Sequence, residues 1–133
     1  MIVTTFNVRG FGGSVKKNKS CELVRQNGVD FLAIQETKLE VITPALCYSL
    51  WGGEDCDWVF KAYEGNSGGI LSIWRKSCAN IEFSFQGEGY VGVCLEWGVE
   101  KVRSIVVNVY SKCELGTKRR LWEALLEERQ SRG

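Results

Sequence analysis

Residues 29–35 read Val-Asp-Phe-Leu-Ala-Ile-Gln, a nearly continuous apolar run. A short apolar run without polar alternation is typical of a strand that is buried on both faces. Strands of parallel sheets have such surroundings, because their crossover helices cover the faces of the sheet. Residues 29–35 therefore predict a central strand, and the residues on either side predict what surrounds it.

The residues before this run predict a strand and a helix. Residues 2–8 are β-branched and apolar, and glycines at positions 10, 12 and 13 end that strand. Residues 15–27 carry a helical apolar stripe, with Ser14 as the expected N-cap and Gly28 as the expected C′ residue. A strand, a helix and a strand in this order form a right-handed βαβ unit with parallel strands. The carboxyl ends of both strands are therefore expected at one edge of the sheet.

Downstream of residue 36 the pattern changes. Residues 37–53 are expected to be irregular or partly helical, interrupted by Pro44, the only proline. From Asp57 onward, turn signals separate short strands at a spacing typical of an antiparallel meander. The expected strands are residues 58–63, 69–75, 80–86, 90–97 and 102–110. An amphipathic helix is expected over residues 117–130. Because a parallel pair and antiparallel strands are both expected, the sheet is mixed, and helices flank it. The expected class is α/β, bordering on α+β.

The composition is that of an ordinary globular chain. It has 133 residues, 44% apolar and 25% charged, the size of one domain or a piece of one. With 17 basic and 16 acidic residues the formal charge is +1, so no net field draws the protein to nucleic acid. Any binding of phosphate must come from local clusters of basic residues.

Six cysteines and no histidine restrict the metal chemistry and the compartment. A mixed cysteine–histidine zinc site is excluded, and the lack of a C-x-x-C pair argues against an all-cysteine site. The N-terminus lacks the basic and apolar regions of a signal peptide, so we expect an intracellular, soluble protein, either nuclear or cytoplasmic. No apolar run approaches the ~20 residues that cross a bilayer, so no membrane partner is expected.

Asn7 and Glu36 come at the ends of the two strands that are predicted to be parallel. In open sheets, ligands gather at the carboxyl ends of such strands. A carboxamide and a carboxylate provide oxygen ligands, which suit a hard cation such as Mg²⁺. From spacing alone an alternative stays open, in which Asn7 serves a turn and Glu36 opens the next helix, where its charge suits the helix dipole.

Four motifs in order carry a resemblance to a known family. They are Thr5-Phe6-Asn7-Val8-Arg9-Gly10, residues 30–38 (DFLAIQETK), Ser67-Gly68-Gly69-Ile70, and Val107-Asn108-Val109-Tyr110-Ser111 with KRRLW at 118–122 after it. This series resembles the exonuclease–endonuclease–phosphatase (DNase I-like) family. It is most similar to the endonuclease domain of plant LINE-type retrotransposons, and the order and rough spacing of the motifs agree across almost the whole chain.

The resemblance implies Mg²⁺-dependent hydrolysis of phosphodiesters, with Glu36 as the principal metal carboxylate and Asn7 as a second polar group beside the metal. Tyr110 is then expected to contact the scissile phosphate, because a phenol can hydrogen-bond a phosphoryl oxygen. Gln35 and Thr37 flank Glu36 and are expected to support it. The alternative for Tyr110 is an ordinary aromatic residue at a strand end.

The chain also departs from the family pattern. A complete domain continues to a Gly-Asp-Phe-Asn-like segment, which supplies the aspartate that orients the attacking water, and to a Ser-Asp-His segment; neither is present. Residues 1–133 are therefore expected to be a single truncated domain, the N-terminal half of a four-layer αββα sandwich. We expect an inactive chain that binds Mg²⁺ weakly. Its strands are expected to make up mainly one of the two sheets and to self-associate through an uncovered apolar face.

Two basic clusters are candidates for contact with a DNA backbone. The first comprises Arg9, Lys16, Lys17 and Lys19, and the second comprises Lys118, Arg119 and Arg120. Contacts of this kind depend on salt and carry no sequence information. The alternative for either cluster is a solvated helix face.

The leading interpretation is an endonuclease that acts on DNA in the complete parent domain, of which this chain is an inactive fragment. DNA is favoured by the retrotransposon-like motifs and by the short loops, since relatives that act on lipids are expected to carry membrane-facing insertions. The alternatives are a non-catalytic interaction or binding fragment, and a phosphatase or RNA-acting branch of the same family.

Overall fold

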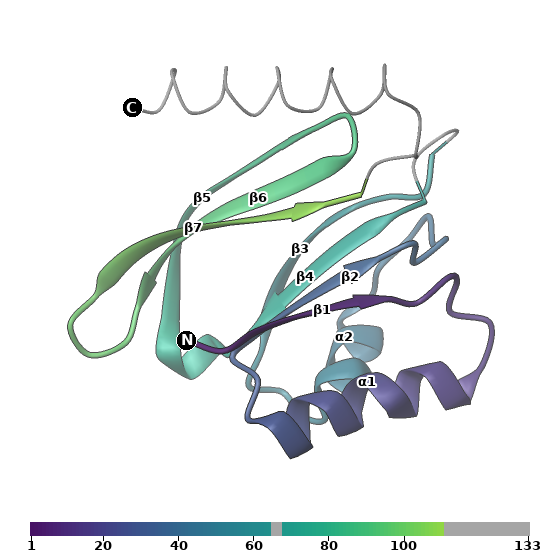
Figure 1. Ribbon diagram of the computed structural model, residues 1–133, viewed down its shortest axis with the longest axis horizontal. Helices are drawn as coiled ribbons and strands as arrows, with labels where there is room; N and C mark the ends of the chain where they lie inside the picture. Colours follow the sequence, from purple (N-terminus) through teal and green to yellow (C-terminus); the bar gives the residue numbers. More distant parts are fainter. Residues whose placement is uncertain (65–67, 111–133) are drawn as a thin grey trace.

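The computed structural model describes residues 1–64 and 68–110; the expected helix at 117–130 lies outside them, as do the candidate residues Lys118 and Arg119. In the described part, two β-sheets pack face to face and two α-helices cover the outer face of the first sheet (Figure 1). The predicted class, an α/β sandwich with a mixed sheet and flanking helices, is confirmed. Neither described helix has the length and apolar character that crossing a membrane requires.

The first sheet has the strand order β1-β2-β4-β3. Its strands are β1 (Val3–Asn7), β2 (Phe31–Gln35), β3 (Asp57–Lys61) and β4 (Ile70–Trp74). β1 and β2 are parallel, as the predicted βαβ unit requires, and Asn7 lies opposite Gln35. β4 is antiparallel to both β2 and β3, so the sheet is mixed.

Helix α1 (Ser14–Asn27) joins β1 to β2 close to the predicted bounds. The assignment of Ser14 as the N-cap is wrong, because Gly13 is the extended cap residue and Ser14 is already helical. Glycine is tolerated at this position, so the helix can begin without a capping side chain. Gly28 ends the helix as predicted, with a φ of 58° and its N–H donated to the carbonyl oxygen of Val24.

Helix α2 (Pro44–Trp51) accounts for the partial helix expected within residues 37–53. Pro44 begins this helix, which corrects the expectation that it interrupts the segment. Proline suits the first helical turn because its missing N–H would have no intrahelical partner there. Thr43 is the N-cap, and its side-chain oxygen accepts a 3.1 Å hydrogen bond from the backbone N–H of Leu46.

The second sheet is an antiparallel meander of β5 (Ala79–Gly87), β6 (Tyr90–Trp97) and β7 (Val102–Val109). A 3₁₀ turn, η1 (Lys76–Cys78), leads into it from β4. Two expectations are therefore wrong: β3 and β4 do not belong to the meander, and the strands do not make up mainly one sheet. The physical reason lies in β4, whose residues are all buried and which therefore needs neighbours on both sides and cover on both faces.

Each face of the first sheet has its own core. On the helix side, Leu32 and Ile73 belong to a cluster with residues of α1 and α2. On the other side, the rings of Phe31 and Trp74 stack with 5.9 Å between centroids and pack with Val93 of β6. The second sheet thus covers the face that was expected to be bare. The expectation of self-association through that uncovered face is therefore not supported by the described residues.

Candidate functional site at the carboxyl edge of the parallel strands

Parallel pairing continues beyond the ends of β1 and β2. Val8 N donates to Gln35 O at 3.0 Å, Gly10 N to Glu36 O at 2.7 Å, and Phe11 N to Thr37 O at 3.2 Å. These bonds tie the loop after β1 to the loop after β2. Asn7, which is exposed, and Glu36, which is half-buried, therefore lie at the same edge of the first sheet.

The backbone at this edge adopts an uncommon conformation. Arg9, Glu36 and Lys38 have φ values of 52°, 56° and 55°, and they are three of the four non-glycine residues with positive φ in the described ranges. A non-glycine residue in this left-handed region costs roughly 1–2 kcal/mol. Such residues tend to cluster where a functional side chain needs a particular direction. The sequence pattern gave no sign of this strain, because none of the three residues is a glycine.

Two glycines before β4 close the site from the other side. Gly68 O accepts from Lys38 N at 2.7 Å, and Gly69 O accepts from Thr37 N at 3.1 Å. A methyl group added at Gly68 would lie 3.1 Å from Glu36 Cγ and 3.5 Å from Tyr110 Cε1. Gly68 therefore lies between the side chains of Glu36 and Tyr110, and its lack of a side chain lets them approach each other.

Tyr110 is delivered to this place by the second sheet. It follows β7 directly, its N–H donates to Gly89 O at 2.8 Å, and its side chain is half-buried. The structure thus brings Glu36 of the first sheet and Tyr110 of the second to the same glycine, Gly68, while Asn7 lies at the same edge of the first sheet. Their chemical roles remain predictions.

Asn108, on β7, was not singled out from the sequence. Its side chain is 1% exposed and joins the two sheets. The two hydrogens of Nδ2 are shared among Ile34 O at 3.2 Å, Leu71 O at 3.1 Å and Ser72 Oγ at 3.2 Å, while Oδ1 accepts from Gln35 Nε2 at 2.7 Å. The signal that could have identified it is the lone carboxamide within the run Ile-Val-Val-Asn-Val.

The basic residues near the edge have different roles. Arg9 is exposed, and its N–H donates to Asn7 Oδ1 at 3.2 Å. Lys16 turns back to the loop after β1, where its ammonium group donates to the carbonyl oxygens of Arg9 and Gly10. Lys17 is half-buried on α1. Lys38 was missed by the sequence analysis; it is exposed, and a methyl group added at Gly10 would lie 3.3 Å from its Cδ.

The residue types fit a partial shell for a hard cation. Glu36 offers a carboxylate and Asn7 a carboxamide oxygen, and Mg²⁺ is commonly held by one or two carboxylates with water completing its shell. Among residues 1–64 and 68–110, no group of three or more histidine, cysteine, aspartate or glutamate side chains is placed to hold a metal. The described chain therefore supplies a minority of the ligands that a tightly bound ion would need.

The buried thiols do not offer an alternative chemistry. Burial raises the pKa of Cys47 to about 12 and that of Cys56 to about 11. Smaller contributions come from the Cys56 thiolate and Asp57 for Cys47, and from Asp57 and Asp55 for Cys56. A thiol with such a pKa is almost entirely protonated at neutral pH, whereas the thiolate is the nucleophile. Both side chains therefore behave as core residues.

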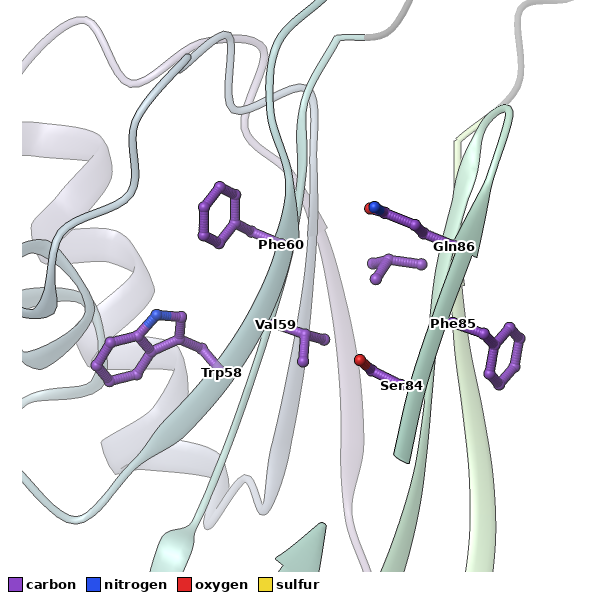
Figure 2. A pocket seen from close by; sticks show the side chains of 7 residues that line it. Trp58, Val59, Phe60, Ser84, Phe85 and Gln86 are labelled. Atoms are coloured by element: carbon purple, nitrogen blue, oxygen red, sulfur yellow. The ribbon is translucent and has the colours of Figure 1, made fainter. Parts of the chain in front are cut away.

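A hollow lies away from the candidate edge, between the outer strands β3 and β5. Figure 2 shows Val59, Ser84 and Gln86 directed into it, whereas Trp58, Phe60 and Phe85 point away. Its volume is about 340 Å³, and its lining residues are all uncharged. A hollow without a cationic side chain does not suit a phosphodiester, so the carboxyl edge remains the candidate site.

Comparisons with solved structures identify the fold. A functionally unknown conserved protein from Enterococcus faecalis V583 aligns with a TM-score of 0.69 and 15% identity over 96% of this chain and 60% of its own. The human Nocturnin catalytic domain aligns with a TM-score of 0.69 and 12% identity over 96% of this chain and 58% of its own. AP endonuclease LMAP from Leishmania major aligns with a TM-score of 0.58 and 22% identity over 90% of this chain and 43% of its own. The chain has part of a DNase I-like fold.

These comparisons support the fold and not a closer relationship. No protein-family model and no curated protein matches the chain. The chain spans 43% to 60% of the length of these three structures. Identities of 12% to 22% show a shared fold alone, because one fold can carry many different activities.

Proposed function

We propose that the chain carries part of the active site of a metal-dependent phosphodiesterase that acts on DNA as an endonuclease. The observation that supports this most is the approach of Glu36 and Tyr110 to each other across Gly68, at the carboxyl edge of two parallel strands. A carboxylate and a phenol from different sheets both lie next to Gly68 there, and the backbone of Glu36 is left-handed. Such a combination suits a charged ligand, and open sheets bind ligands at this edge.

Each residue has a role in this proposal. Glu36 and Asn7 would hold Mg²⁺, which supplies Lewis-acid polarisation of a phosphoryl oxygen when it is bound. Tyr110 donates a hydrogen bond from its hydroxyl to a non-bridging oxygen of the scissile phosphate. Arg9, Lys17 and Lys38 contact neighbouring phosphates, together with Lys118 and Arg119 beyond the described residues. Lys16 contributes less to DNA, because its ammonium group already donates to two carbonyl oxygens.

DNA is the proposed substrate because of the structural neighbours and the motifs. One neighbour is an AP endonuclease, and another is D. rerio TDP2, solved with a single-stranded DNA product and aligned with a TM-score of 0.65 at 14% identity over 96% of this chain and 54% of its own. The residues of the four sequence motifs favour an endonuclease related to those of plant LINE-type retrotransposons.

We further propose that residues 1–133 are a truncated domain without turnover of its own. The 133 residues contain no histidine, so a Ser-Asp-His segment would have to come from another chain or segment. Groups that act as one catalytic unit lose nearly all activity when one of them is removed. The chain is therefore expected to bind Mg²⁺ weakly and to leave DNA intact.

The proposal is tested by titrating the 133-residue chain with Mg²⁺ while NMR records the backbone amides. Shifts centred on residues 7–10, 36–38 and 68–69 are expected, with weak affinity, and Glu36→Ala should abolish them. Glu54→Ala is the matched control, because Glu54 is an exposed carboxylate outside this edge. Shifts that survive Glu36→Ala, or that are centred elsewhere, would contradict the proposed site.

The second candidate function is a non-catalytic interaction fragment. It is favoured by the outer strands β1 and β7, each paired on one side only among the described strands. Val3 on β1 is 44% exposed, and Val102 and Ile105 on β7 are 56% and 57% exposed. Open strand edges with apolar side chains can pair with another chain. Light scattering distinguishes the two: an interaction fragment forms a stable complex or oligomer that Ile105→Lys disrupts, whereas an isolated part of a nuclease need not.

A further inference from the structure

The side chain of Asn108 connects the elements that lead into the candidate site. Its partners Ile34 and Gln35 lie at the end of β2, immediately before Glu36. Its partners Leu71 and Ser72 lie on β4, shortly after Gly68. One buried carboxamide on the second sheet is thus bonded to two of the strands of the first sheet, β2 and β4, whose ends lie at the site.

Tyr110 directly follows the same strand, and its N–H donates to Gly89 O just before β6. Side chains two residues apart on a strand point to the same face, so Asn108 and Tyr110 both face the first sheet. The bonds of Asn108 to β2 and β4 fix the position of this part of β7 along those strands. Because Tyr110 follows two residues later, its position relative to the site edge of the first sheet is fixed as well.

Packing alone would not specify this position so closely. Apolar side chains between two sheets can slide past one another at modest cost, because dispersion contacts have little directional preference. Hydrogen bonds to Ile34 O and Leu71 O are directional, and shifting β7 along the first sheet would break them. A carboxamide that lost these partners while buried would be strongly unfavourable, so the network allows one alignment.

We infer that Asn108 is a positioning residue that sets the separation between Glu36 and Tyr110. The inference deepens the proposed function and rests on it, because this separation matters only if both residues act on one phosphodiester. Asn108 does not contact the substrate in this assignment. It acts through the ends of β2, β4 and β7.

The test compares two substitutions at the interface between the sheets in the full 133-residue chain. Asn108→Leu keeps a side chain of similar size and removes all four hydrogen bonds. Val93→Ala is the matched control, because Val93 is fully buried between the same sheets and belongs to an apolar cluster there. The NMR readout is the nuclear Overhauser effect between the Tyr110 ring and Gly68 Hα, which are close in the native fold.

The expected result is loss of this Overhauser contact in Asn108→Leu and its retention in Val93→Ala at comparable stability. If Asn108→Leu fails to fold, Gln35→Met takes its place, because it removes the bond to Asn108 Oδ1 and leaves the Asn108 side chain intact. The inference would be overturned if folded Asn108→Leu or Gln35→Met kept the Overhauser effect unchanged. It would also be overturned if Val93→Ala lost the effect to the same extent.

A second measurement separates this inference from the proposed function. Mn²⁺ replaces Mg²⁺ and broadens the resonances of nearby nuclei. In the wild-type chain, broadening is expected at both the Glu36 amide and the Tyr110 ring; in Asn108→Leu, it is expected to persist at Glu36 and to be lost at Tyr110. Absence of broadening at Glu36 in the wild-type chain would contradict the proposed metal site while leaving the Overhauser test of Asn108 valid.

Discussion

Gly69 faces Thr37 so closely that a methyl group added to the glycine would lie 2.3 Å from Thr37 Oγ1. Gly69 also has a φ of 86°, and its carbonyl oxygen accepts the N–H of Thr37. Thr37, at 1% exposure, has no room to move away. The loop after β2 and the segment before β4 therefore fit together only if residue 69 lacks a side chain.

Gly69→Ala is expected to lower the free energy of unfolding by roughly 3 kcal/mol, from the combined cost of a left-handed alanine and overpacking. Urea denaturation followed by tryptophan fluorescence measures the change. Gly53→Ala is the control, because Gly53 has open space around its Cα and no positive φ. Equal effects of the two substitutions would show that the close contact at residue 69 does not constrain the fold.

Lys16 is expected to support the loop after β1 more than it supports DNA binding. Replacement by methionine removes the hydrogen bonds to the carbonyl oxygens of Arg9 and Gly10 and should cost about 1 kcal/mol of stability, since the group is exposed. Lys17→Met is the neighbouring control and should cost less. Thermal unfolding at two salt concentrations provides the measurement, and an equal or larger loss in Lys17→Met would contradict the assigned role.

Stability is expected to fall as the pH rises above about 9. In the folded chain the pKa of Cys47 is raised to about 12 and that of Cys56 to about 11, from an ordinary value of 9.0. Both thiols hold their protons in the folded state at pH values where the unfolded chain releases them, so this contribution is complete below pH 9 and declines toward pH 11–12. The loss should be on the order of 2 kcal/mol per thiol by pH 11.

Chemical denaturation at pH 8 and pH 10.5 tests this dependence. The double variant Cys47→Ala and Cys56→Ala, although less stable at pH 8 because of the cavities it creates, should lose less stability between the two values than the wild-type chain. A drop of the same size in both proteins would assign the alkaline loss to other groups.

The isolated chain is expected to leave supercoiled plasmid intact in Mg²⁺. The reason is chemical: Glu36, Asn7 and Tyr110 provide metal binding and one phosphate contact, but activation of water and stabilisation of the leaving group need further residues. Agarose electrophoresis after prolonged incubation is the measurement, with Glu36→Ala as the control for contaminating nuclease. Nicking by the wild-type chain that is absent with Glu36→Ala would show that the 133 residues suffice for turnover.

Much of the first sheet followed from local pattern. The apolar run at 29–35, the helix before it and Gly28 after that helix predicted a βαβ unit, and the parallel pairing of β1 with β2 agrees. This worked because periodicity and glycine placement reflect the backbone locally. It also placed Asn7 and Glu36 at one edge, since parallel strands must end on the same side.

The division of the strands between two sheets could not be obtained in the same way. Residues of β4 and β6 are similarly apolar, and nothing in their order shows that β4 pairs with β2 while β6 begins a separate meander. Short turns join neighbouring strands within a sheet or between sheets equally well. The regular spacing of the strands predicted a single meander, but spacing does not specify which strands pair.

By itself the sequence determined the strand and helix segments, the shared carboxyl edge and the candidate residues there. The tertiary structure alone decided how Tyr110 reaches Glu36, because Asn108 bonds to Gln35 at a separation of 73 residues and no local pattern encodes such a contact. It also decided the left-handed backbone of Arg9, Glu36 and Lys38, whose cost is borne by bonds from the neighbouring loops. Local pattern records what each segment prefers, whereas these features exist because packed segments override that preference.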